Sequence, residues 1–161
     1  MANFDKQKII DTTRRAVFKF TYAQDRTISP ITLTAGTVTG SIFWSDLSFG
    51  LTAATSDTSR VDISKIYWSV SPIGASGSPS VAISWARPAA AITGGNVALF
   101  LSGNGTYDLA TNGINLINPL TGSARLNQID VYNATTTTAS ESVIYSVLIE
   151  VDKVSGFGVT G

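Results

Sequence analysis

Short runs in which apolar residues occupy every second position recur along the chain. The clearest is RRAVFKFTY, residues 14–22, where Phe18, Phe20 and Tyr22 share one face. Another is SVIYSVLIEVD, residues 142–152, which is apolar on both faces. A period of two is that of a β-strand, and apolar residues on both faces indicate an interior or covered strand. Gly, Pro, Asn and Ser separate the runs, and the 3.6-residue period of an amphipathic helix is not apparent.

The runs predict an all-β protein with eight or nine strands. The predicted strands are residues 14–22, 31–34, 41–49, 61–70, 80–86, 96–102, 125–132 and 142–152, with a short return strand beginning at Tyr107. Without an internal repeat of fixed period, this number of strands favours an antiparallel β-sandwich that is jelly-roll-like. Residues 61–70 and 80–86 would form a hairpin, and Asn104-Gly105 predicts a tight turn.

The run VDISKIYWSV, residues 61–70, changes phase in its middle. Val61 and Ile63 alternate with polar residues, but the next apolar set has the opposite parity. An extra residue near Ser64-Lys65 would make a β-bulge, after which Ile66, Trp68 and Val70 take over the core face. Tyr67 would then point outwards as a candidate surface contact. Two short strands separated by a kink are the alternative.

The length of 161 residues predicts one folded domain with short extensions. Residues 1–13 are polar apart from a few isolated apolar positions and are predicted to be an N-terminal arm. Residues 14–153 are predicted to be the β-sandwich domain, and the glycine-rich residues 154–161 a C-terminal tail.

The charge balance argues against two classes of partner. Eleven Lys and Arg residues balance eleven Asp and Glu residues, and charged residues make up only 14% of the chain. Nucleic acid and anionic membranes favour a concentrated positive surface, so neither is an expected partner. A neutral surface with few charges favours self-association.

The N-terminus lacks the apolar segment of a secretory signal, which predicts synthesis in the cytoplasm without export.

The residue types that carry most enzyme chemistry are missing. The chain has no histidine and no cysteine, which removes the common general base, the thiolate nucleophile and the usual transition-metal ligands. Asp46, Asp57 and Asp62 are the nearest approach to an acidic cluster, and are interpreted as turn and solvent-face residues. A calcium site at Asp57 and Asp62 would lack the spacing of a known calcium loop. We therefore predict no catalytic residue, no metal site, no cofactor and no enzyme activity.

The three tryptophans, Trp44, Trp68 and Trp85, admit two interpretations. In a carbohydrate-binding module they would be exposed on one sheet face and stack on sugars. Their positions within apolar runs favour packing in the core or at a subunit contact.

Taken in order, TRRAVFKFTY, VDISKIYWSVS, VAISW and YSVLIEVDK resemble the β-sandwich head decoration (cement) proteins of tailed phages and related small virion proteins. The resemblance covers about half of the chain and consists of strand texture and aromatic positions, with no catalytic signature. It implies a structural subunit on the capsid exterior, which binds the major capsid protein as a homotrimer around local three-fold axes. The loops at residues 71–79 and 133–140 depart from a simple template.

Burial of apolar surface and edge-strand pairing would hold such a subunit on its lattice. The expected partner-binding residues are Phe4, Ile9 and Ile10 in the arm, Tyr67 in the bulged strand, and Phe157 in the tail. The alternative function is a carbohydrate-binding or adhesin-like β-sandwich module on a phage tail or fibre.

Overall fold

A computed structural model of the chain describes residues 2–24, 38–43, 46–47, 60–73, 81–85, 97–113, 116–119, 129–134 and 142–155. The predicted strand at residues 31–34 lies outside the described residues, as do Asp57, Trp44 and Phe157.

The described residues form nine strands and one short helix. In chain order these are β1 (Ala2–Asp11), β2 (Arg15–Gln24), β3 (Val38–Ile42), β4 (Arg60–Ile73), β5 (Val81–Trp85), β6 (Val97–Leu101), β7 (Gly103–Asp108), α1 (Leu109–Asn112), β8 (Ile129–Asn133) and β9 (Ser142–Ser155). No described helix is long and apolar enough to cross a membrane.

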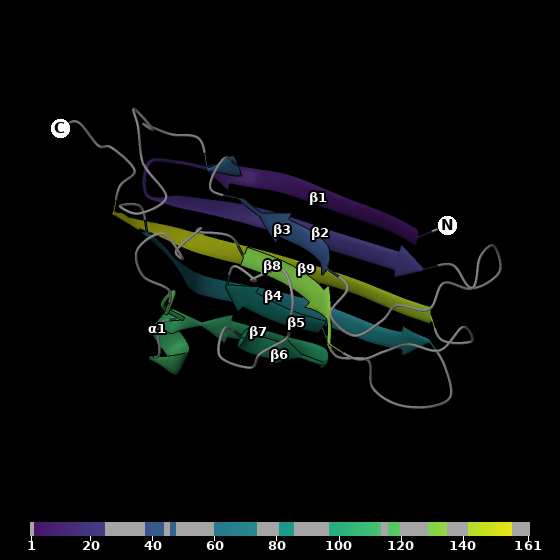
Figure 1. Cartoon of the computed structure of the whole chain (residues 1–161). Helices are drawn as coiled ribbons and strands as arrows, with labels where there is room; N and C mark the ends of the chain where they lie inside the picture. The colour runs from purple at the N-terminus through teal and green to yellow at the C-terminus, as the bar shows by residue number, and fades with distance from the viewer. Residues whose placement is uncertain are drawn as a thin grey trace.

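The strands form two layers, which Figure 1 shows one in front of the other. The larger sheet has the order β1-β2-β9-β4-β7, and the smaller sheet has the order β3-β8-β5-β6. Neighbouring strands are antiparallel in both sheets. The predicted all-β antiparallel sandwich is therefore confirmed.

The strand order is that of a jelly roll. Strand β2 pairs with β9, β3 with β8, β4 with β7, and β5 with β6. The eight strands thus behave as one long antiparallel ribbon that is wound into two sheets, with β1 added beside β2. This winding confirms the jelly-roll prediction.

The same winding overturns two local predictions. Residues 61–70 and 80–86 do not form a hairpin, because β4 and β5 lie in opposite sheets. Each strand has apolar residues on the face towards the other layer, and placing them in opposite layers buries both faces in one core. Asn104 and Gly105 lie within β7 and do not form a turn.

Strand β4 contains the predicted bulge. Its register against β9 shifts between Ile63 and Lys65, so Ser64 is the extra residue. Val61, Ile63, Ile66 and Val70 all belong to the core, on both sides of the bulge. The strand is continuous from Arg60 to Ile73, so the alternative of two separate strands is not what forms.

The core lies between the sheets and is mostly aliphatic and aromatic. Its largest fully buried side chains include Phe18 and Phe20 of β2, Ile149 of β9, Ile83 of β5 and Ile129 of β8. Two consecutive hydrogen bonds cross the core. The Tyr145 hydroxyl donates to Thr39 Oγ1, and the Thr39 hydroxyl donates to the Val131 carbonyl at 3.1 Å. These hydrogen bonds connect β9 of the larger sheet to β3 and β8 of the smaller sheet.

Residues 2–11, predicted to be part of an arm, instead form β1, the edge strand of the larger sheet. The predicted boundary near residue 13 is the β1–β2 turn, where the Thr12 amide donates to the Arg15 carbonyl at 2.8 Å. Lys6 and Lys8 occupy strand positions that commonly hold apolar residues, and each forms an ion pair, with Asp46 and with Asp11 respectively. The two lysines interrupt the apolar alternation that marks the other long strands.

At the C-terminal end of the domain, β9 continues to Ser155, beyond the predicted start of the tail at residue 154.

Candidate functional site

The acidic residues do not assemble into a catalytic or metal-binding cluster within the described part of the chain. No described group of three or more Asp and Glu side chains could hold a metal ion. Asp46 has the predicted turn role, because its carboxylate accepts from the Phe43 amide at 2.8 Å. The predicted strand at residues 41–49 is wrong in its bounds, because β3 ends at Ile42, before Asp46. The prediction that Asp62 lies on the solvent face is wrong. Asp62 is buried within β4, and Arg60 contacts its carboxylate at 3.2 Å.

A shallow groove of about 740 Å³ lies on the larger sheet. Five strands contribute to it: its lining residues are Ile9, Lys19, Tyr67, Trp68, Ser69, Asn104, Gly105, Thr106, Ser146 and Leu148. We call it the outer-sheet groove, because most of its side chains point away from the smaller sheet.

The strand register assembles the floor of the groove from residues far apart in sequence. Lys19 of β2 lies opposite Leu148 of β9, Leu148 opposite Tyr67 of β4, and Tyr67 opposite Thr106 of β7. Directly opposed side chains in antiparallel strands have Cβ atoms about 4.5–5.5 Å apart. These four residues therefore form one continuous strip across the sheet.

Ile9 lines the groove at its β1 end and lies diagonally beside Lys19, whose directly opposite residue is Gln7. The β1–β2 register shifts between Lys8 and Ile10, which leaves Ile9 as an extra residue that lines the groove. Ile9 is 50% exposed and Tyr67 is 42% exposed. The groove therefore presents an aliphatic side chain and an aromatic ring to solvent from opposite sides of Leu148.

One side of the strip is polar and uncharged. Ser146 of β9 lies opposite Ser69 of β4, and Ser69 lies opposite Asn104 of β7. Hydroxyl and amide groups both donate and accept hydrogen bonds. Among the described residues that line the groove, Lys19 is the only charged one, and none carries a carboxylate. This composition suits binding through contact area and neutral hydrogen bonds.

The other side of the strip carries paired charges. Lys65 contacts Asp108 at 3.2 Å, and Arg15 contacts Glu150 at 3.5 Å. The hydrogen bond from the Ala110 amide, together with Lys65, lowers the pKa of the Asp108 carboxyl. The hydrogen bond to Asp108 in turn raises the pKa of Lys65. Both groups stay charged at neutral pH, and the border on this side has little net charge.

The structure brings together two of the predicted partner-binding residues, Ile9 and Tyr67, in the outer-sheet groove. Ile10 is 37% exposed and lies opposite Val17 beside the groove. Phe4 does not join them: its ring stacks on Phe20 with centroids 6.1 Å apart. Phe157 lies outside the described residues.

Lys19 and Leu148 are groove residues that the sequence did not single out. The signal was present, because both occupy the face opposite the main apolar set in the runs at residues 14–22 and 142–152. The strand register decides which outward-facing residues meet across the sheet. The register cannot be read from the alternation of apolar residues along one strand.

The tryptophans follow the packing interpretation where they are described. Trp85 is buried in the core. Trp68 packs against the core, and its indole lies so close to Gly105 that a Cβ atom there would overlap the ring. The Trp68 Nε1 group donates to the Ser102 carbonyl at 3.1 Å. A sugar-stacking role for Trp85 is therefore wrong, and Trp44 lies outside the described residues.

Comparison with known proteins finds a likeness among solved structures. No protein-family model matches the chain, and no curated protein matches it. Among solved structures, the chain is similar to the coat protein in a structure of the Tobacco streak virus coat protein dimer. The identity is 10%, the alignment covers 84% of each chain, and the TM-score is 0.32. The jelly-roll assignment rests on the strand order of this chain itself.

Proposed function

We propose that the chain is a non-enzymatic virion structural protein that decorates a tailed-phage capsid and binds the major capsid protein through the outer-sheet groove. The observation that carries the proposal is the continuous strip formed by Lys19, Leu148, Tyr67 and Thr106, with Ile9 lining the groove beside it. A strip of this kind offers an open contact surface to a protein partner.

The composition of the strip supports binding to another protein. Aromatic and aliphatic side chains at the centre of a contact, with polar groups around it, are the usual anatomy of a protein interface. Tyr67 is the expected anchor, because tyrosine is among the residues that most often dominate interface energies. The paired charges at Lys65–Asp108 and Arg15–Glu150 would then lie at the rim.

The fold and the sequence resemblance support the same reading. Jelly rolls build many viral capsid domains, although the fold is shared with lectins and does not specify a function. Following the resemblance, we place the protein on the capsid exterior as a homotrimer around local three-fold axes, after synthesis in the host cytoplasm.

Co-sedimentation tests the proposal with capsids assembled from the major capsid protein that the same genome encodes. We expect saturable binding of the full chain, and at least tenfold weaker binding, roughly, for Tyr67→Ala and for Ile9→Ser. Val38→Ser is the matched control, because Val38 and Tyr67 are equally exposed at 42% but lie on different sheets. Unchanged binding by both groove variants, or no binding by the full chain, would reject the proposal.

A carbohydrate-binding module is the second candidate. The observation that favours it is the neutral row Ser146, Ser69 and Asn104 beside the exposed ring of Tyr67, because sugars are bound by aromatic faces and neutral hydrogen-bonding groups. A glycan array distinguishes the two functions. Saturable binding that Tyr67→Ala abolishes would support this candidate, and a silent array would remove it.

A further inference from the structure

Strand β6 ends the smaller sheet with an apolar edge. Its sequence is Val97-Ala98-Leu99-Phe100-Leu101, without a charged or polar side chain. Among the described strands it pairs only with β5. The backbone groups on the other edge of such a strand form a template for pairing with a further strand.

The other three outer strands carry features that discourage such pairing. Strand β1 alternates through Asp5, Lys6 and Lys8. In β3, the Ser41 carbonyl accepts from Lys6 Nζ at 3.2 Å. Strand β7 contains two glycines and ends in Asp108. Charges on an edge, and side chains that cover it, are the usual protection against edge-to-edge association. Strand β6 has no charge of this kind.

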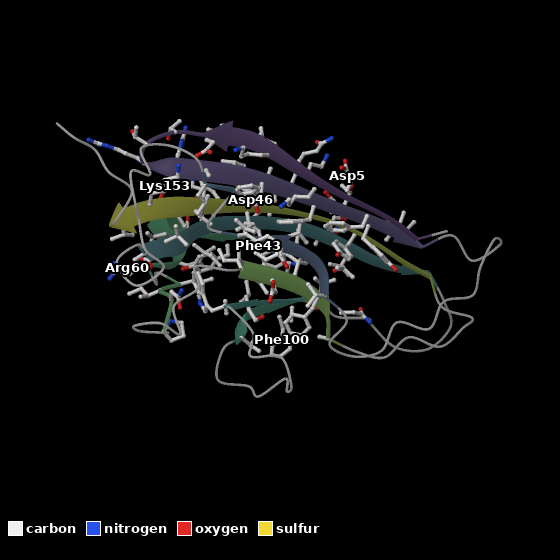
Figure 2. All side chains as sticks on the ribbon, turned by 45° about the horizontal axis from the view of Figure 1, so that its top comes forward. Asp5, Phe43, Asp46, Arg60, Phe100 and Lys153 are labelled. Atoms are coloured by element: carbon white, nitrogen blue, oxygen red, sulfur yellow. The ribbon has the colours of Figure 1, made fainter. Side chains whose placement is uncertain are left out.

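Phe100 adds exposed apolar surface to this edge. It is 61% exposed, the largest exposed fraction among the large hydrophobic residues that the structure describes. It lies opposite Ala82, while its neighbours Leu99 and Leu101 lie opposite core residues of β5. Figure 2 places Phe100 at the margin of the smaller sheet, pointing away from the larger one. An aromatic ring there contributes nothing to the core, and it is available to an adjoining strand.

We propose that β6 pairs with β6 of a second copy of this chain, antiparallel about a two-fold axis. The two four-stranded sheets would then join into one continuous sheet of eight strands. Pairing β6 with itself brings no charge into the contact. Pairing it with β1 or β7 would place Lys6 or Asp108 against an apolar strand. A second β6 is therefore the occupant that best matches this edge.

The proposed β6–β6 contact buries a small area, so the dimer should be weak. A stable interface buries about 1,600 Å² in total, and two five-residue strands with two phenylalanine rings cover less than that. We expect a weak dimer with a dissociation constant of about 10–100 μM. On a lattice, where copies are already held close together, the same contact would link neighbouring subunits or trimers at high effective concentration.

Sedimentation velocity of the isolated full chain tests the inference at loadings from about 1 to about 500 μM. The sedimenting species should double in mass as concentration rises. Phe100→Lys should weaken this association at least tenfold, roughly, because it places two positive charges near the two-fold axis. Val38→Lys, an equivalent change at an exposed site on the opposite strand of the same sheet, should leave the association unchanged.

A crosslinking experiment tests the geometry without changing the charge. The chain has no natural cysteine, so Phe100→Cys and Val38→Cys each carry a single thiol. Oxidation should produce covalent dimers from Phe100→Cys, and few from Val38→Cys. A species of constant mass at every loading, or association that survives Phe100→Lys, would overturn the inference. Neither experiment uses a capsid, so failure of the proposed function leaves this result unaffected.

Discussion

Lys153 and Asp11 form a largely buried ion pair at the β1–β2 end of the larger sheet, with Nζ of Lys153 2.5 Å from Oδ1 of Asp11. The Lys153 side chain is completely buried, and Asp11 is only 8% exposed. The same ammonium group donates to the Thr12 carbonyl at 2.6 Å. Figure 2 shows Lys153 at the end of β9, beside the β1–β2 turn. The pair therefore fixes β1 and its turn to the far end of the chain's last strand.

Removing one member of this pair should destabilise the protein strongly. Breaking a buried ion pair leaves a charge in a poorly solvated site and costs about 3–5 kcal/mol. Lys8, which lies 3.2 Å from the other oxygen of the Asp11 carboxylate, still compensates that charge in part. We therefore expect Lys153→Met to lower the free energy of unfolding by about 3 kcal/mol, the lower end of this range. Urea denaturation measures this change.

The double variant Asp11→Asn/Lys153→Met provides the control for the ion pair. Because it removes both charges, it should be less destabilised than the sum of the two single variants by at least about 1 kcal/mol. Simple additivity of the two single changes would show that the two groups are not coupled.

The close approach of Phe4 and Gly40 should make glycine necessary in β3. A Cβ atom at Gly40 would lie 2.5 Å from Cζ of Phe4 and 2.7 Å from Cδ1 of Phe20. Overpacking of this kind costs about 1–3 kcal/mol, so we expect Gly40→Ala to lower stability by that amount. Thermal unfolding followed by circular dichroism measures the loss.

Shortening Phe4 should rescue that variant in part. Phe4→Leu removes the ring atoms closest to Gly40, so Gly40→Ala should cost less in a Phe4→Leu background than in the natural chain. An identical cost in both backgrounds would mean that β1 does not pack over β3.

The buried hydroxyl of Tyr145 should make the protein sensitive to alkali. Burial raises the pKa of Tyr145 above its ordinary value of about 10. The folded state therefore keeps the proton at a pH where the unfolded chain releases it. The free energy of unfolding should fall as pH rises above about 10, and it should be independent of this group at lower pH.

Tyr145→Phe isolates that contribution. The variant should lose about 1 kcal/mol at neutral pH, because the hydrogen bond to Thr39 is removed. Its stability should then decline less steeply above about pH 10 than that of the natural chain. Urea midpoints at a series of pH values measure both effects, and equal slopes would contradict the assignment.

The sequence predicts strands best where one face is apolar without interruption. The run at residues 14–22 lies in β2 except for Arg14, and the run at residues 142–152 falls within β9. The phase change in residues 61–70 locates the bulge at Ser64. In each case the side chains that enter the core sit at strictly spaced positions, so that local pattern and tertiary position agree.

Predictions fail where polar side chains or winding decide the outcome. Strand β1 places Lys6 and Lys8 where an apolar pattern would be expected, and their ion pairs with Asp46 and Asp11 replace apolar burial. Asn104-Gly105 resembles a hairpin turn locally, but the jelly-roll winding extends β7 through it. The outer-sheet groove depends on the registers of four strand pairs, and each register is set by contacts between distant segments.

Cryo-electron microscopy of the particle that the same genome encodes tests the central proposal most directly. We expect density for this chain on the outside of the capsid, with the outer-sheet groove around Tyr67 and Leu148 against the major capsid protein. A particle that lacks the chain would contradict it, as would a bound chain whose groove faces solvent.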